Sequence, residues 1–368
     1  MASAQNQSAI RDAVVIAMIV GGLFLAIEGT VRILLPQTLQ TDYLDGGSIA
    51  IPDDELGHRL RPGAHAVVRG PEFAVEYRHN PRGLRDQAEH PLSKPEGSTR
   101  ILVLGDSFAY GAGNAYEHSW PTLVERQLQT DGHPVEVVKA GVPGYDTRSE
   151  ALYLERIFAD YQPDIVLLTF LPNDLFTNVP IDDQAEALDQ AEPVQARNGK
   201  DSALHSLILL KRLLMAHDRL YARLYMLTQR LEYFTTPPSP TLQRQIEVTQ
   251  ALLDRIASFC REKGSELIVL SIPQQFQVIA PESAEAFGVD VDTIDRVFGT
   301  FAAERDFAWE TTLPTLRQAY RSEGEDLFYR FDGHLNEAGN RSVAAHVAAV
   351  LAGHLPEPPP EPTPEGAV

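Results

Sequence analysis

The sequence predicts an α/β fold, in which helices cover both faces of a parallel sheet, preceded by one membrane-spanning helix. Short runs of consecutive apolar residues recur from residue 100 onward, as in the buried strands of parallel sheets. Most runs are followed by a longer segment in which apolar residues recur at helical spacing. The third observation is an apolar stretch near the amino terminus, over residues 13–35.

The amino-terminal stretch Ala13–Leu35 is long enough to cross a bilayer as a helix. Its part Ala13–Ile27 has no charged residue, and Glu28 and Arg32 follow at a spacing that lets them pair. No small-x-small cleavage site follows, which favours an uncleaved anchor over a signal peptide. We therefore expect a single-pass membrane protein with a tail at residues 1–12 and its main domain periplasmic or extracellular.

The composition limits the possible partners and cofactors. The chain has 51 acidic and 31 basic residues and a formal net charge of −20, which excludes nucleic acid as a partner because phosphate binding needs clustered Lys and Arg. A single cysteine, Cys260, excludes an intramolecular disulfide and a multi-cysteine zinc site. Cys260 lies in an amphipathic run, which favours a small core residue over a nucleophile.

Three further segments are distinguished by composition. Residues 36–99 form a connector rich in Pro, Gly and His, and alternation over residues 73–78 predicts a strand of a small β extension. Residues 175–240 have apolar positions at helical spacing, which favours a helical cap over the sheet edge; a segment lying against a membrane is the alternative. The tail at residues 354–368 is rich in Pro and Glu and is expected to be disordered.

The main domain is expected to span residues 100–353. Its predicted strands are 101–104, 135–138, 165–170 and 267–272, and its predicted helices are about 117–129, 147–160, 241–262, 284–304 and 337–352. Alternation of this kind places the carboxyl ends of the strands at one edge of the sheet, where α/β proteins bind their ligands.

Gly105-Asp106-Ser107 ends the first strand of this domain. Gly105 allows a tight turn, and the backbone NH of Ser107 is then free at the start of the next helix. A phosphate-binding P-loop is excluded because no Gly-Lys-Ser/Thr follows, and the GxGxxG dinucleotide fingerprint is absent. Alone, Gly-Asp-Ser also fits an ordinary turn, but its position after a core strand favours a functional site.

Polar groups follow the next strands as well. Gly144 can offer an unobstructed backbone NH, with Thr147 capping the following helix, although a plain loop explains both residues too. Asn173 can point its amide into the same crevice, or it can serve as a turn or N-cap residue. Asp332 and His334 share a loop before the last helix, which makes His334 a candidate base and Asp332 its orienting carboxylate.

Together these motifs resemble the four sequence blocks of the SGNH (GDSL-like) hydrolases: Gly105-Asp106-Ser107, Gly144, Asn173-Asp174 and Asp332-x-His334. The segments 80–86 and 141–145 are similar to the membrane-anchored bacterial members of that superfamily. The resemblance covers roughly residues 70–353. It implies a three-layer α/β/α domain with about five parallel strands in flavodoxin-like order.

The resemblance also implies roles for the site residues. Ser107 would be the nucleophile, His334 its general base, and Asp332 the carboxylate that orients His334. The oxyanion hole would consist of the backbone NH groups of Ser107 and Gly144 and the side chain of Asn173. The implied reaction is acyl transfer through an acyl-Ser107 intermediate, with small O-acyl esters as substrates and no metal or organic cofactor.

This chain departs from the family pattern at two positions. Leu171 replaces the usual glycine of the third block, which questions the geometry of Asn173. Phe331 stands where the fourth block usually has its aspartate, so we expect Asp332, in preference to Asp326 or Asp106, to orient the histidine. The resulting Asp-x-His spacing is similar to the polysaccharide O-acetylation branch of the superfamily.

The substrate and the reaction class stay open at this stage. Acetyl groups on a cell-envelope glycan are the favoured ester. One alternative is a polysaccharide O-acetyltransferase that uses the same triad and receives acyl groups from a membrane partner protein. The other alternative is a non-catalytic glycan-binding protein on the same fold, which the presence of all four blocks disfavours.

Overall fold

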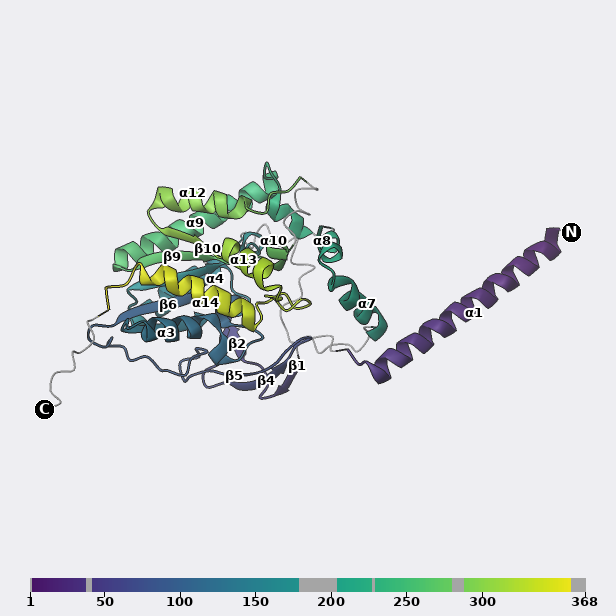
Figure 1. The fold of residues 1–368 in the computed structure, drawn as a ribbon, viewed down its shortest axis with the longest axis horizontal. Coiled ribbons are helices and arrows are strands. Elements are labelled where there is room, and N and C mark those ends of the chain that lie inside the picture. Colours follow the sequence, from purple (N-terminus) through teal and green to yellow (C-terminus); the bar gives the residue numbers. More distant parts are fainter. Residues whose placement is uncertain (1, 38–41, 179–203, 227–228, 280–287, 359–368) are drawn as a thin grey trace.

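The computed structural model describes residues 2–37, 42–178, 204–226, 229–279 and 288–358 (Figure 1). Its central sheet has five parallel strands in the order β10-β9-β8-β6-β7. The strands are β6 (Thr99–Gly105), β7 (Val135–Gly141), β8 (Ile165–Phe170), β9 (Glu266–Ser271) and β10 (Ala308–Thr311). Counted along this sheet the order is 2-1-3-4-5 from the β7 edge, which is the predicted flavodoxin-like topology.

Helices cover both faces of this sheet, as predicted. One group contains α3 (Trp120–Thr130), α13 (Leu313–Glu323) and α14 (Glu337–Ala352), and the other contains α4 (Thr147–Tyr161), α9 (Pro240–Lys263) and α12 (Thr293–Arg305) (Figure 1). The short helices of the domain are α2 (Ser107–Tyr110), η1 (Tyr116–His118), α5 (Asp174–Thr177) and α10 (Gln275–Ile279). Because the sheet is covered twice, every side chain of residues 101–104 is fully buried, which explains the continuous apolar run.

Helix boundaries follow local capping chemistry. The Ser239 side chain accepts a hydrogen bond from the backbone NH of Leu242, Pro240 occupies the first position of α9, and Gly264 ends the helix in the left-handed conformation. The predicted helix 284–304 begins too early, because the structure starts α12 at Thr293. The residues just before it are occupied otherwise: Val289 pairs with Thr235 in a β-bridge. Residues 280–287 lie outside the described residues.

One further helix boundary needs correction, and two elements were not predicted. The helix expected from residue 117 begins at Trp120, because Tyr116–His118 forms a separate 3-10 turn. The strand β10 and the helix α13 were not predicted. Strand β10 has four half-buried residues at the edge of the sheet, so it lacks the apolar run that marks the inner strands.

The connector forms two small antiparallel sheets that pack on the main domain. One has the order β1-β4-β5 and the other is the hairpin β2–β3. Their strands are β1 (Asp42–Asp45), β2 (Ala50–Asp53), β3 (Gly57–Leu60), β4 (His65–Arg69) and β5 (Ala74–Arg78). The strand expected over residues 73–78 is β5, so this part of the β extension is confirmed.

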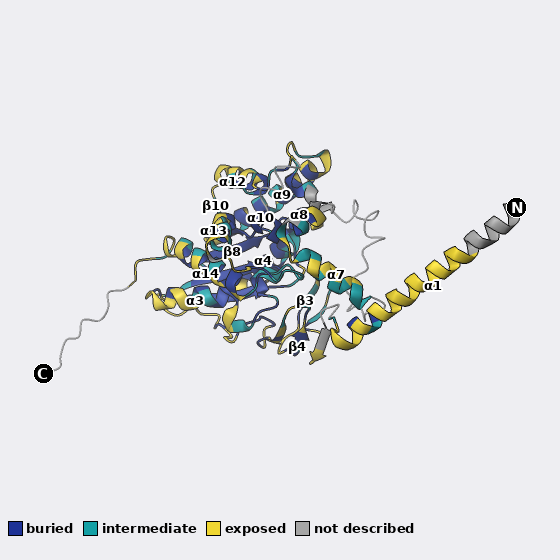
Figure 2. Cartoon of the chain, turned by 45° about the vertical axis from the view of Figure 1, so that its right-hand side comes forward, coloured by how far each residue is buried: buried dark blue, intermediate teal, exposed yellow. Residues whose placement is uncertain are grey.

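The amino-terminal helix α1 (Ala2–Leu34) projects away from the domain and is largely exposed (Figures 1 and 2). Within the described part of the chain it is the one helix long and apolar enough to cross a membrane, over Arg11–Leu34. The described parts of the 175–240 segment beyond α5 include α7 (His205–Met215), α8 (Asp218–Met226) and the 3-10 turn η2 (Gln229–Phe234). Residues 179–203 and 227–228 of that segment, and residues 359–368 of the tail, lie outside the described residues.

Candidate active site

Three loops that carry predicted site residues leave the carboxyl ends of adjacent strands. In the parallel ladders Gly105 pairs with Gly141, and Leu104 pairs with Leu168. The ends of β6, β7 and β8 therefore lie at one edge of the sheet, and the loops with Ser107, Gly144 and Asn173 all start there.

The turn into Ser107 depends on two glycines. Gly105 has φ +154°, and a Cβ added to it would lie 1.6 Å from Thr169 Oγ1. A Cβ on Gly141 would lie 2.4 Å from the backbone nitrogen of Tyr110, so α2 packs directly on the end of β7. Asp106 caps α2 by accepting a hydrogen bond from the NH of Phe108 at 2.8 Å. Ser107 is thereby fixed at the first helical position, half-buried at the sheet edge.

The structure brings Ser107, His334 and Asp332 together in one hydrogen-bonded chain. The distance between Ser107 Oγ and His334 Nε2 is 2.7 Å, and the distance between His334 Nδ1 and Asp332 Oδ1 is 2.5 Å. Gly333, at φ +93°, makes the turn that lets both neighbouring side chains point inward. With the Asp332 carboxylate on Nδ1, the proton sits there and leaves Nε2 free to accept the serine proton.

The other two aspartates that could have oriented the histidine have different partners. Asp326 accepts a hydrogen bond from Arg330 Nη2 at 2.6 Å, on the outer side of the loop. Asp106 is engaged in capping α2. The short contact to His334 Nδ1 is made by Asp332.

The electrostatics of the site raise the pKa of His334 and lower the pKa of Asp332. Burial favours the neutral ring, but the hydrogen bond and charge of Asp332, together with the charge of Asp106, raise the pKa of His334 above its ordinary value. Burial opposes ionisation of Asp332 as well, yet its hydrogen bond to His334 holds the pKa of this carboxyl below its ordinary value. Burial raises the pKa of Asp106 to about 6.

The loop with Gly144 is held by the connector. Gly144 has φ +86°, a conformation that favours glycine, and its position is fixed by His58 from strand β3. His58 Nε2 lies 2.8 Å from the carbonyl oxygen of Pro143, and the Tyr145 hydroxyl donates to the carbonyl oxygen of His58 at 2.8 Å. The helix after this loop is capped by Asp146, so the predicted capping role of Thr147 is wrong.

Asn173 stands at the N-cap position of α5 but makes no side-chain capping hydrogen bond. Its backbone is already helical there, which explains why the side chain does not fold back on the helix. Leu171 is only 2% exposed, so the leucine that replaces the family glycine packs into the core. The oxyanion-hole assignment of Asn173 stays a prediction.

The loop that carries Asp332 and His334 is held by residues that no sequence motif indicated. The backbone NH groups of Phe331 and Asp332 both donate to Glu72 Oε2, at 2.7 and 2.9 Å. Arg330 pairs with Asp218 of α8 at 2.7 Å. These contacts join segments more than a hundred residues apart, so no local sequence pattern could have revealed them.

Behind Ser107 the connector supplies a buried arginine. Arg85 is 3% exposed, and its guanidinium donates to the carbonyl oxygens of Tyr110, Gly111 and Asn114. These carbonyls end α2 and form the loop after it, so Arg85 fixes the helix that carries the serine. Arg85 lies in the segment 80–86, which carries part of the sequence resemblance.

Two buried carboxyl groups lie behind the loops of Gly144 and Asn173. Glu150 and Asp174 are 0% and 1% exposed, and both oxygens of Glu150 and one of Asp174 have no hydrogen-bond partner within the described residues. Burial raises the pKa of Glu150, and the charges of Asp174, Asp106 and Asp146 raise it further. Burial and the charges of Asp106 and Asp146 likewise raise the pKa of Asp174. Both groups therefore favour their neutral forms.

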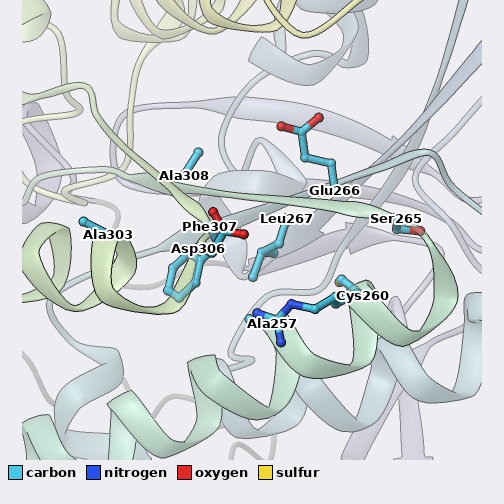
Figure 3. A pocket seen from close by; sticks show the side chains of 10 residues that line it. Ala257, Cys260, Ser265, Glu266, Leu267, Ala303, Asp306, Phe307 and Ala308 are labelled. Atoms are coloured by element: carbon cyan, nitrogen blue, oxygen red, sulfur yellow. The ribbon is translucent and has the colours of Figure 1, made fainter.

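A separate pocket lies at the opposite, amino-terminal edge of the sheet (Figure 3). It lies between the ends of α9 and α12 and the beginnings of β9 and β10, with Cys260, Glu266 and Phe307 among its lining residues. Burial raises the pKa of the Cys260 thiol to about 12, so it is protonated at neutral pH and unsuited to nucleophilic attack. Among the residues that the structure describes, no cluster of His, Cys, Asp or Glu could hold a metal ion.

Comparison with known families agrees with the geometry of the serine site. Residues 103–342 match the model of the GDSL-like Lipase/Acylhydrolase family, and this match covers more than half of the chain. The chain belongs to this family. The matched region begins in β6, ahead of Ser107, and ends in α14, behind His334, so it includes every residue of the predicted site.

Individual relatives match shorter segments. An arylesterase of Vibrio mimicus is 32% identical over 85 residues, 23% of this chain and 42% of the relative. Esterase TesA of Pseudomonas aeruginosa is 24% identical over 110 residues, 30% of this chain and 55% of the relative. The chain thus spans about half the length of these relatives.

Two solved structures are also similar to this chain. A crystal structure of TesA has a TM-score of 0.42 at 18% identity, covering 70% of this chain and 100% of the other. The acetyl xylan esterase AlAXEase has a TM-score of 0.42 at 13% identity, covering 68% of this chain and 99% of the other.

Proposed function

We propose that the protein is a serine-dependent ester hydrolase that works through an acyl-Ser107 intermediate. The observation that carries the proposal is the hydrogen-bonded chain from Ser107 Oγ through the His334 ring to Asp332. Membership of the acylhydrolase family supports the same reaction class. A hydroxyl group within hydrogen-bond distance of an oriented imidazole is the arrangement that activates a serine for attack on an ester.

The first half of the reaction forms the intermediate. Ser107 Oγ attacks the ester carbonyl carbon while its proton passes to His334 Nε2, and a tetrahedral oxyanion forms. Donors from the NH groups of Ser107 and Gly144 and from the Asn173 amide stabilise that oxyanion. When it collapses, the bond to the alcohol breaks, and the alcohol leaves with the proton from His334.

The second half reverses these roles with water as the nucleophile. His334 Nε2 takes a proton from the attacking water, the oxyanion forms again at the same donors, and the bond from the acyl group to Ser107 breaks. Ser107 recovers its proton from His334 and the free acid is released. Asp332 remains ionised throughout, because it holds the Nδ1 proton and balances the imidazolium charge.

Small O-acyl esters are the proposed substrates, with acetyl groups on cell-envelope glycans as the favoured class. The Asp332-x-His334 spacing, similar to the polysaccharide O-acetylation branch, supports this choice. A sugar hydroxyl in place of water would turn the same residues into a transferase. Product analysis with and without an added acetyl acceptor separates the two reactions.

The proposal extends to the location and division of the chain. Helix α1 has the length and composition of a single membrane anchor, and we place the catalytic domain of residues 100–353 on the periplasmic or extracellular side. The connector of residues 36–99 then joins the anchor to the domain. A reporter that is active only in the cytoplasm, fused after Val368, should be inactive; its activity would reverse this topology.

The direct test of the activity is turnover of acyl nitrophenyl esters and acetylated glycans by the purified full-length protein in detergent. Ser107→Ala should reduce kcat by at least about 10⁴-fold, since the nucleophile is lost. Ser93→Ala, at an exposed position of the connector, serves as the matched control and should retain full activity. Equal activity of both variants would remove Ser107 from the mechanism.

A further inference from the structure

Helix α7 leaves an apolar face uncovered. Leu207, Leu210 and Leu213 follow one another at spacings of three residues, so they line one side of the helix, and their exposed fractions are 59%, 50% and 60%. A stripe of three large exposed side chains on one helix is unusual on a soluble surface and marks a contact with an apolar partner.

The opposite side of α7 is tied to the domain, which fixes the direction of the leucine face. Arg212 donates to the Gln37 side chain and to the carbonyl oxygen of Pro71, both at 2.9 Å. The charged groups of Lys211 and Arg212 lie 4.8 and 5.2 Å from the ring centre of Phe331. Phe331 precedes Asp332, so α7 packs on the loop that carries the acid–base pair.

The amino terminus of α7 is tied to helix α1. The Glu28 carboxylate accepts hydrogen bonds from the backbone NH groups of His205 and Ser206, at 3.0 and 2.9 Å, and from the Ser206 hydroxyl at 2.6 Å. The N-cap residue Leu204 offers no side-chain cap, so Glu28 satisfies the free NH groups and complements the helix dipole. Glu28 is 7% exposed, in a helix that is otherwise largely exposed.

The position of Glu28 along α1 determines how deep the contact between α1 and α7 lies in a membrane. The uncharged run Ala13–Ile27 spans about 22 Å as a helix, less than the ~30 Å of hydrocarbon in a typical bilayer. If α1 crosses a membrane, Glu28 therefore lies inside the bilayer or close to its surface. Helix α7 begins at that level and runs across the end of α1 without continuing it (Figures 1 and 2).

We propose that α7 is an interfacial helix, and that Leu207, Leu210 and Leu213 insert into the surface of the membrane that α1 crosses. This inference rests on the proposed anchoring by α1. A helix that lies in the membrane plane with leucines on its apolar face is typical of this location. Because α7 also packs on Phe331, the membrane surface then lies next to the acid–base loop, and the enzyme acts on esters presented close to the bilayer.

The test uses full-length protein reconstituted into phosphatidylethanolamine–phosphatidylglycerol vesicles. An environment-sensitive fluorophore is attached to single introduced cysteines; Cys260 is 1% exposed and stays unlabelled in the folded protein. The positions are Leu210→Cys on α7, Ile19→Cys within α1, and Leu92→Cys as an exposed leucine at the opposite edge of the sheet. The carbonyl of Leu92 contacts Arg100, at the start of β6, which establishes that location.

Lipids with a quencher on the acyl chain report contact with the bilayer. We expect strong quenching at Ile19→Cys, clear quenching with a blue-shifted emission at Leu210→Cys, and none at Leu92→Cys. Leu213→Cys should repeat the result of Leu210→Cys. If Ile19→Cys is quenched while Leu210→Cys and Leu213→Cys behave like Leu92→Cys, the interfacial helix is refuted and the anchor stands. If Ile19→Cys is also unquenched, the anchor itself fails, and the inference with it.

Discussion

The two edges of the central sheet differ in what their polar groups do. At the carboxyl edge, Ser107 and His334 are half-buried and lie in a chain of short hydrogen bonds that ends at Asp332. At the amino edge, Lys94 pairs with Asp164, and Arg100 pairs with Glu136 and with backbone carbonyls. The first set places a serine hydroxyl against an imidazole ring. In the second set the charged groups pair with one another and hold strand ends together.

The amino edge has a pocket lined by the cysteine, whereas the predicted site residues lie at the carboxyl edge. The pocket around Cys260 offers a thiol that burial keeps protonated. At the carboxyl edge, three residues of the connector contact the site loops: Arg85 the segment after β6, His58 the loop after β7, and Glu72 the loop of Asp332 and His334. The hydrogen-bonded chain from Ser107 to Asp332 makes the carboxyl edge the candidate site, in preference to the pocket.

The largest expected effect at the carboxyl edge, short of removing the nucleophile, is that of Asp332→Asn. Losing the orienting carboxylate leaves the wrong tautomer of His334, and turnover of a small acyl ester should fall by up to about 10⁴-fold. Asp326→Asn, on the outer side of the same loop, is the matched control and should keep near-normal turnover. A large loss at Asp326→Asn with normal turnover at Asp332→Asn would reverse the assignment.

The pH profile sharpens this prediction. The base must be neutral, so kcat/KM should fall as the pH drops through the raised pKa of His334, above its ordinary value near 6.5. Asp332→Asn removes the negative charge that raises this pKa, so the acidic limb of the pH profile should move to lower pH. An unchanged limb in the residual activity of Asp332→Asn would mean that another group controls it.

The next effect is that of Asn173→Ala. Removing one oxyanion donor typically costs about 10²–10³ in kcat. The fold should stay intact, because the Asn173 side chain makes no capping hydrogen bond to α5. Turnover equal to that of the parent, with an unchanged circular dichroism spectrum, would exclude Asn173 from the oxyanion hole and leave the donors to Ser107 and Gly144.

A pH-dependent stability effect is expected from Glu150→Gln. A carboxyl group whose pKa is raised in the folded protein stabilises the fold fully below its pKa in the unfolded chain, near 4.5. This contribution to the free energy of unfolding is lost as the pH rises through the pKa of the folded protein. The variant has no charge to bury beside Asp174, Asp106 and Asp146, so its stability relative to the parent should increase from pH 4.5 upward. Denaturant unfolding at several pH values measures this trend.

The control for that trend is Glu155→Gln on the same helix. Glu155 forms an exposed ion pair with Arg255, a type of contact worth at most about 1 kcal/mol. Its stability difference from the parent should stay small across the range. Parallel curves for Glu150→Gln and the parent would show that Glu150 carries no raised pKa in the folded protein.

The smallest effect on activity is expected at the amino edge. Cys260→Ala removes one buried atom, which should cost about 1 kcal/mol of stability and lower Tm by a few degrees. Esterase activity at 25 °C should be unchanged, because the thiol takes no part in the reaction. A loss of turnover in the folded variant would break the distinction between the two edges.

The sequence revealed the features that leave a local signal. Strands inside the sheet are buried on both faces and so read as continuous apolar runs, as at residues 101–104 and 165–170. The site motifs follow these strands directly, which is why Ser107 and Asn173 could be placed at one edge. Asp332 and His334 share one short loop, which was the local signal for pairing them.

What stayed hidden depends on contacts between distant segments. Glu72 holds the backbone of Asp332 across 260 positions of sequence, and Glu28 caps a helix that begins 177 positions later. No periodicity or turn chemistry predicts such pairs. The start of α12 was missed for a related reason, since Val289, which lies inside the expected helix, pairs with the distant Thr235 in a β-bridge.

The most direct test of the central claim is to trap the covalent intermediate with a fluorophosphonate. The reagent reacts with an activated serine, and mass spectrometry of the digested protein locates the adduct. The account predicts one adduct, on Ser107, formed rapidly in the parent and at a greatly reduced rate in His334→Ala, where the base that contacts Ser107 Oγ at 2.7 Å is missing. An adduct on another residue, or labelling of Ser107 at the same rate without His334, would contradict it.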